Sequence, residues 1–483
     1  MAMHSLAKTL VRQMAKTTGT ALTTKHWCVL EFAWTYYRQR RVGPLFNNIR
    51  RFTGVTKADL EAMFPNGLIS LYTWVGIPIQ SDANGCKPMA LVEVDNPREV
   101  YLDHNATTPI RQEVVDTLVD FYQDPISYGN PSSPYDLGSV AYDTIDLARK
   151  RIAQCLGVEA EEIYFTGSGT EANNIAIKGI ADRCGGGHIV STNVEHPAVL
   201  ETLRYLETKG FTVTYLPVRC DGSLAVDDMV HALRPDTILV CIMAANNEIG
   251  TINPMAELGA VCRRQGIPYF ADAIQAFGKI PLAPRQAGID MLSLSGHKIH
   301  GPKGTGALFI DKRTKIGPVI HGGGQEMGLR SGTENVAGIK ALGLAATLAH
   351  DEMNRAATNM LALRQHFLAA LRRVAPDAII NGTLGDRLPG NLSVGFAGVD
   401  SGSLLLSFNQ IGVSVSAGSA CGAGADKVSH VLEAIHLDSE RYGTVRFSFG
   451  RDTTLEDINY VFEHLPSILT KLAENQPALR AAS

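Results

Sequence analysis

The stretch Met291–Gly304, MLSLSGHKIHGPKG, places a hydroxyl, an imidazole and an amine directly after a short apolar run. The run predicts a buried strand that ends at Ser295, followed by His297 and Lys298. The carboxyl end of a parallel strand is where α/β folds bind ligands. A lysine that is partly desolvated there, among cationic neighbours, loses its proton easily and forms Schiff bases. The sequence therefore offers Lys298 as a reactive amine, although a surface lysine after a turn would show the same spacing.

Short apolar runs alternate with helical stretches from Tyr101 onward, and Ala141–Leu156 carries its apolar positions on one helical face. This alternation is typical of a mainly parallel sheet with helices on both sides. After about residue 346 a long helical stretch leads into a smaller mixed segment with strands near Asn391–Phe396 and Thr444–Ser448. The strands predicted for the larger sheet are His188–Ser191, Thr212–Leu216, Thr237–Ala245, Tyr269–Ala271, Met291–Leu294 and Ala307–Ile310.

Several further motifs accompany the lysine, and their order along the chain is more specific than any one of them. The segments are Asp103–Pro109, Thr166–Asn174, Asn246–Gly250, Asp272–Gln275, SGHKIHGPKG, HGGGQEMGLRSGTEN (321–335) and SAGSACGAG (416–424). The set resembles the cysteine desulfurases of the NifS/IscS type, which belong to the class V branch of fold-type I pyridoxal phosphate (PLP) enzymes. The resemblance covers roughly residues 100–470. It implies an α/β fold with a large PLP-binding domain and a smaller α+β C-terminal domain.

For the cofactor's phosphate, Gly169 and Thr170 at a predicted helix N-terminus offer backbone N–H groups, a hydroxyl and the helix dipole. The resemblance implies that Ser295 and His297 complete this cradle. It also implies that Thr333 reaches the phosphate from the other subunit of a homodimer with a shared active site.

For the cofactor's ring, the resemblance implies that Asp272 pairs with the protonated pyridine nitrogen and deepens the electron sink. Gln275 would bond the phenolic oxygen, Asn247 would lie beside the same edge, and His196 would stack on the ring. Lys298 would form the Schiff base with the cofactor and then shuttle protons. The alternatives to these roles are purely structural: Thr170 could cap a surface helix, Asp272 could be solvated, and His196 could be a core residue.

The resemblance implies that the substrate is L-cysteine. The resemblance supplies Arg446 as the clamp for the substrate carboxylate, with Asn105 as a second substrate-binding residue and Arg451 as a substitute for Arg446; a guanidinium suits bidentate binding of a carboxylate. Cys421 lies in a glycine-rich loop. Attack by its thiolate on the sulfur of bound cysteine would leave a persulfide on Cys421 and release alanine.

Bulk properties set the remaining limits. The chain has 483 residues, so two or three domains are expected. No apolar run approaches the roughly 18 residues that span a bilayer. Eight cysteines without a CxxC pair favour a reducing cytoplasm over a disulfide framework or a metal site. Net charge is −4, yet residues 1–60 contain ten Lys or Arg residues and only Glu31 and Asp59 as acids.

Residues 1–80 are predicted to form a small helical domain. Thr23-Thr24 can cap a helix that ends near Arg38–Gly43, and two more helices are expected over Leu45–Phe52 and Lys57–Phe64. The basic, hydroxyl-rich first 25 residues could be mistaken for a transit peptide, but an ordinary helix is preferred. Residues 81–100 are predicted to be an arm or linker, followed by a large domain over 101–350, whose first residues contribute to the small domain, and a small domain over 351–483.

Residues 14–87 resemble the DsrC/TusE sulfur-relay family, whose C-terminal arm carries a persulfide. The match places Cys86 on the sulfur-carrying cysteine, with a functionless linker cysteine as the alternative. Tyr72 stands where redox-active members have a second cysteine, so disulfide cycling is not expected. The matching residues are Leu22–Trp27, Tyr36-Tyr37, Met63–Gly67, Gly76–Pro78 and Gly85-Cys86.

Joined together, the two resemblances imply a cysteine desulfurase that relays sulfur from Cys421 to Cys86 and on to sulfur-acceptor proteins. The destination stays open among thiolated tRNA (through tRNA or a tRNA-modifying enzyme), iron–sulfur clusters and a sulfur-oxidation pathway. A selenocysteine lyase or another class V PLP enzyme would share the fold, although Cys421 argues against an aminotransferase. A nucleic-acid-binding regulator that uses the basic N-terminal helices, in the manner of a helix-turn-helix protein, is the alternative from another class.

Overall fold

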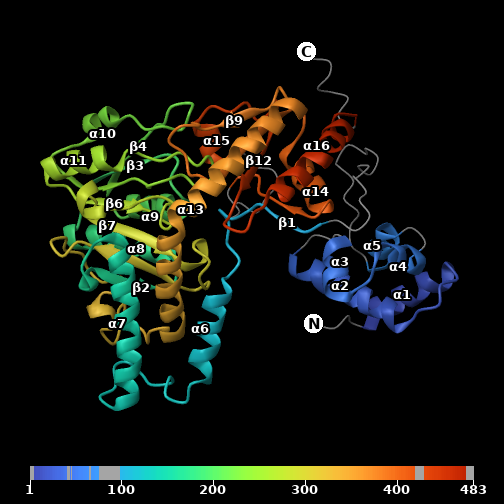
Figure 1. Cartoon of the computed structure of the whole chain (residues 1–483), viewed down its shortest axis with the longest axis horizontal. Coiled ribbons are helices and arrows are strands. Elements are labelled where there is room, and N and C mark those ends of the chain that lie inside the picture. The colour runs from blue at the N-terminus through green and yellow to red at the C-terminus, as the bar shows by residue number, and fades with distance from the viewer. Residues whose placement is uncertain are drawn as a thin grey trace. The chain divides into compact units, whose positions relative to one another are not determined.

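The computed structural model describes residues 5–40, 44, 46–64, 67–75, 98–418 and 429–474 (Figure 1). Contacts between Cα atoms divide the chain into two compact units. The first holds residues 1–100, with 406–414 and 464–483, and the second holds residues 101–405 and 415–463. Cys86 and Cys421 lie outside the described residues. None of the described helices is both long enough and apolar enough to cross a membrane.

The N-terminal region is helical, as the sequence predicts. A buried core of aliphatic and aromatic side chains, including Leu30, Phe64 and Leu71, holds the helices together. Thr56 and Asp59 form a reciprocal capping box at the start of α4. The expected helix over the first residues is confirmed. The last helix was not predicted because its eight residues, LISLYTWV, show no polar face. The helices are α1 (Ser5–Thr17), α2 (Thr24–Arg40), α3 (Phe46–Thr53), α4 (Lys57–Met63) and α5 (Leu68–Val75).

The second unit contains a seven-stranded sheet in the order β2-β8-β7-β6-β5-β3-β4. Strands β3 to β7 are parallel, so the predicted fold class is confirmed. Only β8 runs antiparallel to its neighbours β7 and β2, because it returns from β7 without the crossover helix that a parallel connection needs. The strands are β2 (Ile163–Thr166), β3 (His188–Thr192), β4 (Thr212–Leu216), β5 (Thr237–Cys241), β6 (Tyr269–Asp272), β7 (Met291–Ser295) and β8 (Gly306–Ile310).

Helices cover both faces of this sheet and bury alternate side chains of each strand. Leu292 and Leu294 of β7 belong to a core shared with α7, α11 and α13, whereas Met291 belongs to a core shared with α8 and α9. The period-two alternation of a strand therefore gives an α/β/α arrangement. The helices of this unit are α6 (Gln112–Gln123), α7 (Asp136–Leu156), α8 (Gly169–Cys184), α9 (Pro197–Glu207), α10 (Val226–Ala232), α11 (Met255–Gln265), α12 (Pro284–Ala287) and α13 (Val336–Val374).

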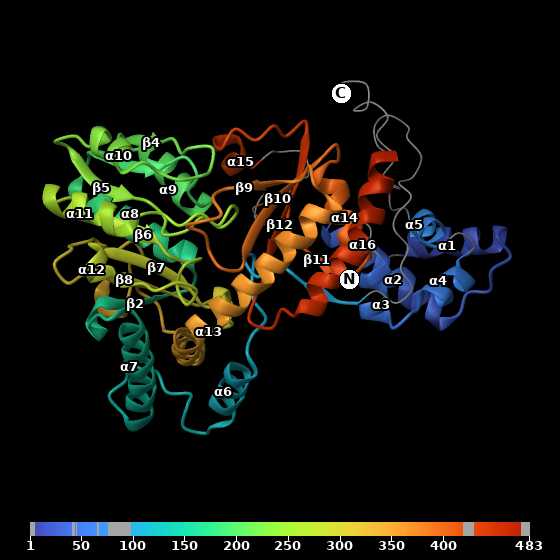
Figure 2. The ribbon, with the colours of Figure 1, turned by 45° about the horizontal axis from the view of Figure 1, so that its top comes forward.

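The 39-residue helix α13 continues from the large sheet to a second, antiparallel sheet of order β12-β10-β9 (Figure 2). Its Phe367 packs against Phe447 of β12 and Phe462 of α16, with ring centroids 4.8 and 4.7 Å apart. The strands predicted near residues 391 and 444 are confirmed. The remaining elements are β1 (Val100–Tyr101), β9 (Ile379–Asn381), β10 (Asn391–Ala397), β11 (Val413–Ser414), β12 (Tyr442–Ser448), α14 (Ser401–Gln410), α15 (His430–Ala434) and α16 (Leu455–Glu474).

Candidate active site

The predicted phosphate cradle and the lysine motif meet at the carboxyl ends of the parallel strands. Gly169 begins α8, and a Cβ built on it would lie 2.2 Å from Ile274 Cδ1 and 3.4 Å from Ser295 Cβ. A side chain at position 169 would have to displace Ile274, so glycine allows the helix N-terminus to approach the segments after β6 and β7 closely. Ser295 is the last residue of β7 and is buried. Gly169 and Ser295 are thus neighbours, as predicted, although 126 positions separate them in the sequence.

Lys298 lies against the segment that opens the second unit. Its Nζ donates to the carbonyl oxygens of Asn105, at 2.5 Å, and Ala106, at 2.8 Å. The backbone N–H and the hydroxyl of Thr108 both donate to the carbonyl oxygen of His297, each at 2.9 Å. Two motifs that are far apart in the sequence therefore form one face of the site.

Asp272 ends β6 as a buried carboxylate. It accepts hydrogen bonds from the side-chain amide of Asn173 (2.7 Å) and from the backbone N–H of Ile274 (3.0 Å). It forms no salt bridge with any residue that the structure describes. Asp272 is thus held in one orientation by neutral donors, and among the described residues it has no salt-bridge partner.

His196 caps α9 with its own ring, because Nδ1 accepts the backbone N–H of Ala198 at 3.1 Å. Burial lowers the pKa of His196, and the charges of Asp272 and Lys298 act on it in opposite directions. The imidazole is therefore neutral at physiological pH and lies near both groups. His196 therefore lies close enough to Asp272 and Lys298 to be influenced by their charges, and its role beside the cofactor ring stays a prediction.

Asn105, Asn247 and Gln275 form a connected polar network. Gln275 Nε2 donates to the carbonyl oxygen of Asn105 at 2.8 Å, and Asn105 Nδ2 donates to the carbonyl oxygen of Asn247 at 3.2 Å. The backbone N–H of Asn105 donates to Ser448 Oγ at 2.9 Å, which joins the network to β12. Three predicted site residues from three distant segments are therefore brought into contact.

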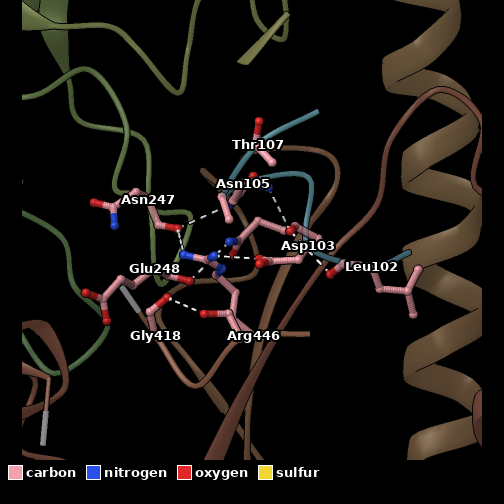
Figure 3. Close-up of polar contacts among 12 residues, drawn as sticks. Leu102, Asp103, Asn105, Thr107, Asn247, Glu248, Gly418 and Arg446 are labelled. Carbon is pink, nitrogen blue, oxygen red and sulfur yellow. Dashed lines mark hydrogen bonds and ion pairs between the residues drawn. The ribbon is translucent and has the colours of Figure 1, made fainter. Parts of the chain in front are cut away.

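Arg446 of β12 is buried at the centre of Figure 3. One terminal nitrogen donates to Asp103 Oδ1 at 2.7 Å and the other donates to the carbonyl oxygen of Asn247 at 3.0 Å. Its Nε–H has no acceptor among the described residues. Burial raises the pKa of Asp103, and the guanidinium opposes that rise. The predicted carboxylate clamp therefore already holds one carboxylate of its own chain and retains an unused donor.

The other three side chains predicted to bind the phosphate are those of His297, Thr170 and Thr333, and unlike Ser295 none of them is fully buried. His297 Nδ1 is 3.1 Å from Thr107 Oγ1, and burial together with Lys298 lowers the pKa of His297 to about 4, so it is a neutral ring. The side chains of Thr170 and Thr333 are exposed in the single chain. The structure thus leaves both hydroxyls available to a ligand or to a second chain.

Sequence reasoning missed three ionisable groups beside the site: the buried Glu195 and Glu248, and the half-buried Lys279. Glu195 accepts from the backbone N–H of Met243 at 3.0 Å, and burial raises its pKa to about 8. Burial also raises the pKa of Glu248, which accepts from Ser429 Oγ at 2.5 Å. The sequence contained a signal for each group: Glu195 precedes His196, Glu248 lies inside the 246–250 motif, and Lys279 follows Gln275 by four positions.

The residues at this edge fit the PLP group that the sequence resemblance implies. A buried carboxylate without a cationic partner suits a protonated pyridine nitrogen. The glycine start of a 16-residue helix suits a phosphate, and an amine at the end of β7 suits an aldehyde. Asp272, Gly169 and Lys298 supply these three features.

Comparison with known proteins gives the same answer. The aminotransferase class-V family model matches residues 100–461. A cysteine desulfurase IscS from Dictyoglomus turgidum is 46% identical, over 79% of this chain and 97% of its own. Another from Methanosarcina thermophila is 45% identical, over 79% of this chain and 94% of its own. The solved structure of a NifS-like protein superposes with a TM-score of 0.72 at 37% identity, covering 77% of this chain and all of that one.

These matches confirm the predicted activity and cofactor. The family model covers residues 100–461, a region that contains every described site residue. The chain belongs to the aminotransferase class-V family and, within it, to the PLP-dependent cysteine desulfurases.

Proposed function

We propose that this chain converts L-cysteine to L-alanine, takes the sulfur as a persulfide on Cys421 and passes it to Cys86. The observation that carries the proposal is that Lys298 and Arg446 both contact the 103–106 segment, while the charges of Lys298 and Asp272 both act on His196. Bound PLP supplies an electron sink that weakens the C–S bond of the substrate. The chain's own residues decide which bond breaks and where the sulfur goes.

One set of residues binds the phosphate of the cofactor, and a second set binds its ring. The N-terminus of α8, with Gly169 and Thr170, binds the phosphate together with Ser295 and His297. Thr333 of the other subunit adds a hydroxyl. This division is supported by the contact of Gly169 with Ser295 and by the exposure of both threonines.

The ring is oriented by a second set of side chains. Asp272 would keep a proton on the pyridine nitrogen, His196 would stack on the ring, and Gln275 and Asn247 would hold its phenolic edge. Lys298 would hold the cofactor through Nζ and would carry protons to and from the substrate. The contact of Lys298 with two backbone carbonyl oxygens supports this role, because neutral acceptors keep the amine in place without fixing its charge.

Arg446 binds the substrate carboxylate, with Asn105 beside it. The pairing of Arg446 with Asp103 supports this role, because the guanidinium already donates to a carboxylate oxygen. Its free Nε–H leaves a donor for a second oxygen. The substrate's thiol is then free to face the Cys421 loop.

In the sulfur step, the Cys421 thiolate attacks the sulfur of the substrate. A new S–S bond forms and the C–S bond breaks, with its electron pair left on the substrate carbon. That carbon takes up a proton, delivered by Lys298 Nζ, and leaves as alanine. Cysteine and a thiol thus give alanine and a persulfide, with no external oxidant or reductant.

Cys86 follows as the carrier because the N-terminal region resembles the DsrC/TusE relay proteins. A tethered acceptor raises the effective concentration of the receiving thiol, towards about the millimolar range for a flexible tether. The onward acceptor belongs to tRNA thiolation, iron–sulfur assembly or sulfur metabolism. The six described cysteines are free thiols, which supports a reducing compartment such as the cytoplasm.

The relay is tested with radiolabelled cysteine sulfur and peptide mapping of the holoenzyme. In the wild-type protein we expect label on Cys421 and Cys86. Cys421→Ser should abolish both labels, and Cys86→Ser should keep the label on Cys421 only. Cys184→Ser, which removes an exposed cysteine outside the relay, serves as the control. Label on Cys86 in the Cys421→Ser variant would exclude the proposed order.

We expect the subunit interface of the homodimer to include the α6–α7 region. Tyr122, Tyr128 and Tyr142 are 74%, 78% and 61% exposed, which is unusual for aromatic side chains gathered on one segment. Tyr122→Ser combined with Tyr128→Ser should shift the protein towards monomer in sedimentation at micromolar concentration. Tyr205→Ser, at a 47% exposed tyrosine of α9, should leave the dimer intact. A wild-type monomer at these concentrations would contradict the shared active site.

A further inference from the structure

Lys279 lies on the turn after β6, four residues beyond Gln275, and directs its amine into the site. Its Nζ donates to Gln275 Oε1 at 2.9 Å and is 3.5 Å from Asn105 Oδ1. The backbone N–H of Lys279 donates to the carbonyl oxygen of Ala276 at 3.0 Å, which fixes the turn. Lys279 therefore contacts one predicted cofactor-binding residue and one predicted substrate-binding residue.

The electrostatic surroundings of Lys279 are unfavourable for an ordinary lysine. It forms no salt bridge within the described part of the second unit. Burial, and then the positive charges of Lys298 and Arg446, lower the pKa of Lys279 to about 7. Such a lysine is only partly charged at neutral pH. Lysines held near cations without an acidic partner are concentrated at functional sites.

Two contacts hold the Gln275 amide in one orientation. A lysine amine is a donor, so Oε1 accepts from Lys279 Nζ, and Nε2 donates to the carbonyl oxygen of Asn105. Lys279 therefore supplies one of the two contacts that keep Nε2 as the donor that the proposed role of Gln275 requires. Loss of the lysine should leave the amide less firmly placed.

We infer that Lys279 is a positioning residue of the desulfurase: it fixes the amide of Gln275 and the side chain of Asn105, and it adds positive charge beside Lys298. The inference rests on the proposed roles of Gln275 and Asn105. Coulomb interaction between Lys279 and Lys298 is mutual, so the charge that lowers one proton affinity lowers the other. The charged or titratable groups whose pKa values are linked to Lys279 are Lys298, Arg446, His104 and His297.

The test is a pH titration of the visible absorbance of the bound cofactor in the holoenzyme. Lys279→Met keeps the length of the side chain but removes its donor and charge. With a nearby cation removed, the nitrogen of Lys298 should keep its proton to higher pH, so the titration midpoint should rise by about one pH unit. Lys279→Arg should restore most of the wild-type midpoint. Lys303→Met, which removes an exposed cation in the same segment as Lys298, is the matched control and should not shift it.

A kinetic readout separates positioning from simple packing. Misplacement of Gln275 and Asn105 should lower kcat/KM for L-cysteine by up to about 100-fold in Lys279→Met. Should that variant fail to fold, Lys279→Gln removes the charge while keeping a donor, and its midpoint should still rise. A wild-type midpoint in Lys279→Met, whatever its activity, overturns the inference.

Gln275→Ala separates this failure from failure of the proposed function. If Gln275→Ala shifts the midpoint and Lys279→Met does not, the role of Gln275 stands and the role of Lys279 is excluded. If neither variant shifts it, the proposed role of Gln275 is also wrong.

Discussion

Replacing Lys298 with alanine should lower the rate of alanine formation by about 10⁴-fold, the upper range for loss of a positioned acid–base group. The amine lies against the carbonyl oxygens of Asn105 and Ala106, and no other lysine of the described chain takes this position. Borohydride reduction followed by peptide mapping should find the cofactor on Lys298 in the wild-type protein. The variant should carry no cofactor-modified peptide.

Lys303→Ala is the matched control for this variant. Lys303 follows Lys298 by five residues and is exposed, so it should keep both turnover and the modified Lys298 peptide. A Lys298→Ala protein that still yields a reduced cofactor adduct at Lys279 would show that the two amines can replace one another. Full alanine formation by Lys298→Ala would refute the assignment of the reactive amine.

Local sequence could predict which site residues lie at the carboxyl ends of strands. Asp272 and Ser295 each follow a short apolar run, and in a parallel sheet the carboxyl ends of such runs meet at one edge. The cap of α2 at Thr23 could also be predicted, because threonine is a preferred residue at helix N-termini. In the structure the carbonyl oxygen of Thr23 accepts from the backbone N–H of Trp27 at 3.2 Å.

Contacts between distant segments could not be predicted from local pattern. The placement of Asn105 against Lys298 depends on a backbone contact across 193 positions, and family resemblance alone suggested that the two share a site. The pairing of Arg446 with Asp103 was missed although both residues had been noticed, because nothing in either motif identifies the other as its partner. Lys279 was missed because its contacts, not its spacing, distinguish it from a surface lysine.

Arg446→Ala should lower kcat/KM for L-cysteine by about 100-fold to 1,000-fold, mostly through KM. Charge-assisted hydrogen bonds contribute about 1.5–3 kcal/mol each, and Arg446 has more than one donor aimed at the site. The loss should depend on the substrate's carboxylate. For cysteamine, which lacks that group, wild type and variant should therefore process the thiol at similar rates, and an equal loss for both substrates would show that Arg446 acts on something else.

Removing Arg446 also leaves the half-buried carboxylate of Asp103 without its cation. Breaking one partner of a fully buried pair costs about 3–5 kcal/mol, and the cost here should lie below that range because the Asp103 side chain is 16% exposed. Burial already raises the folded-state pKa of Asp103. At low pH the carboxyl group is protonated, which removes the cost of an unpaired charge. The instability of Arg446→Ala should therefore grow as pH rises. The double variant Arg446→Ala/Asp103→Asn should recover thermal stability at pH 8 without recovering KM for L-cysteine. That split separates the binding role of the guanidinium from its pairing with Asp103, because only the pairing can be restored by neutralising the carboxylate. If stability and KM recover together, Arg446 supports the fold and a different residue binds the substrate carboxylate.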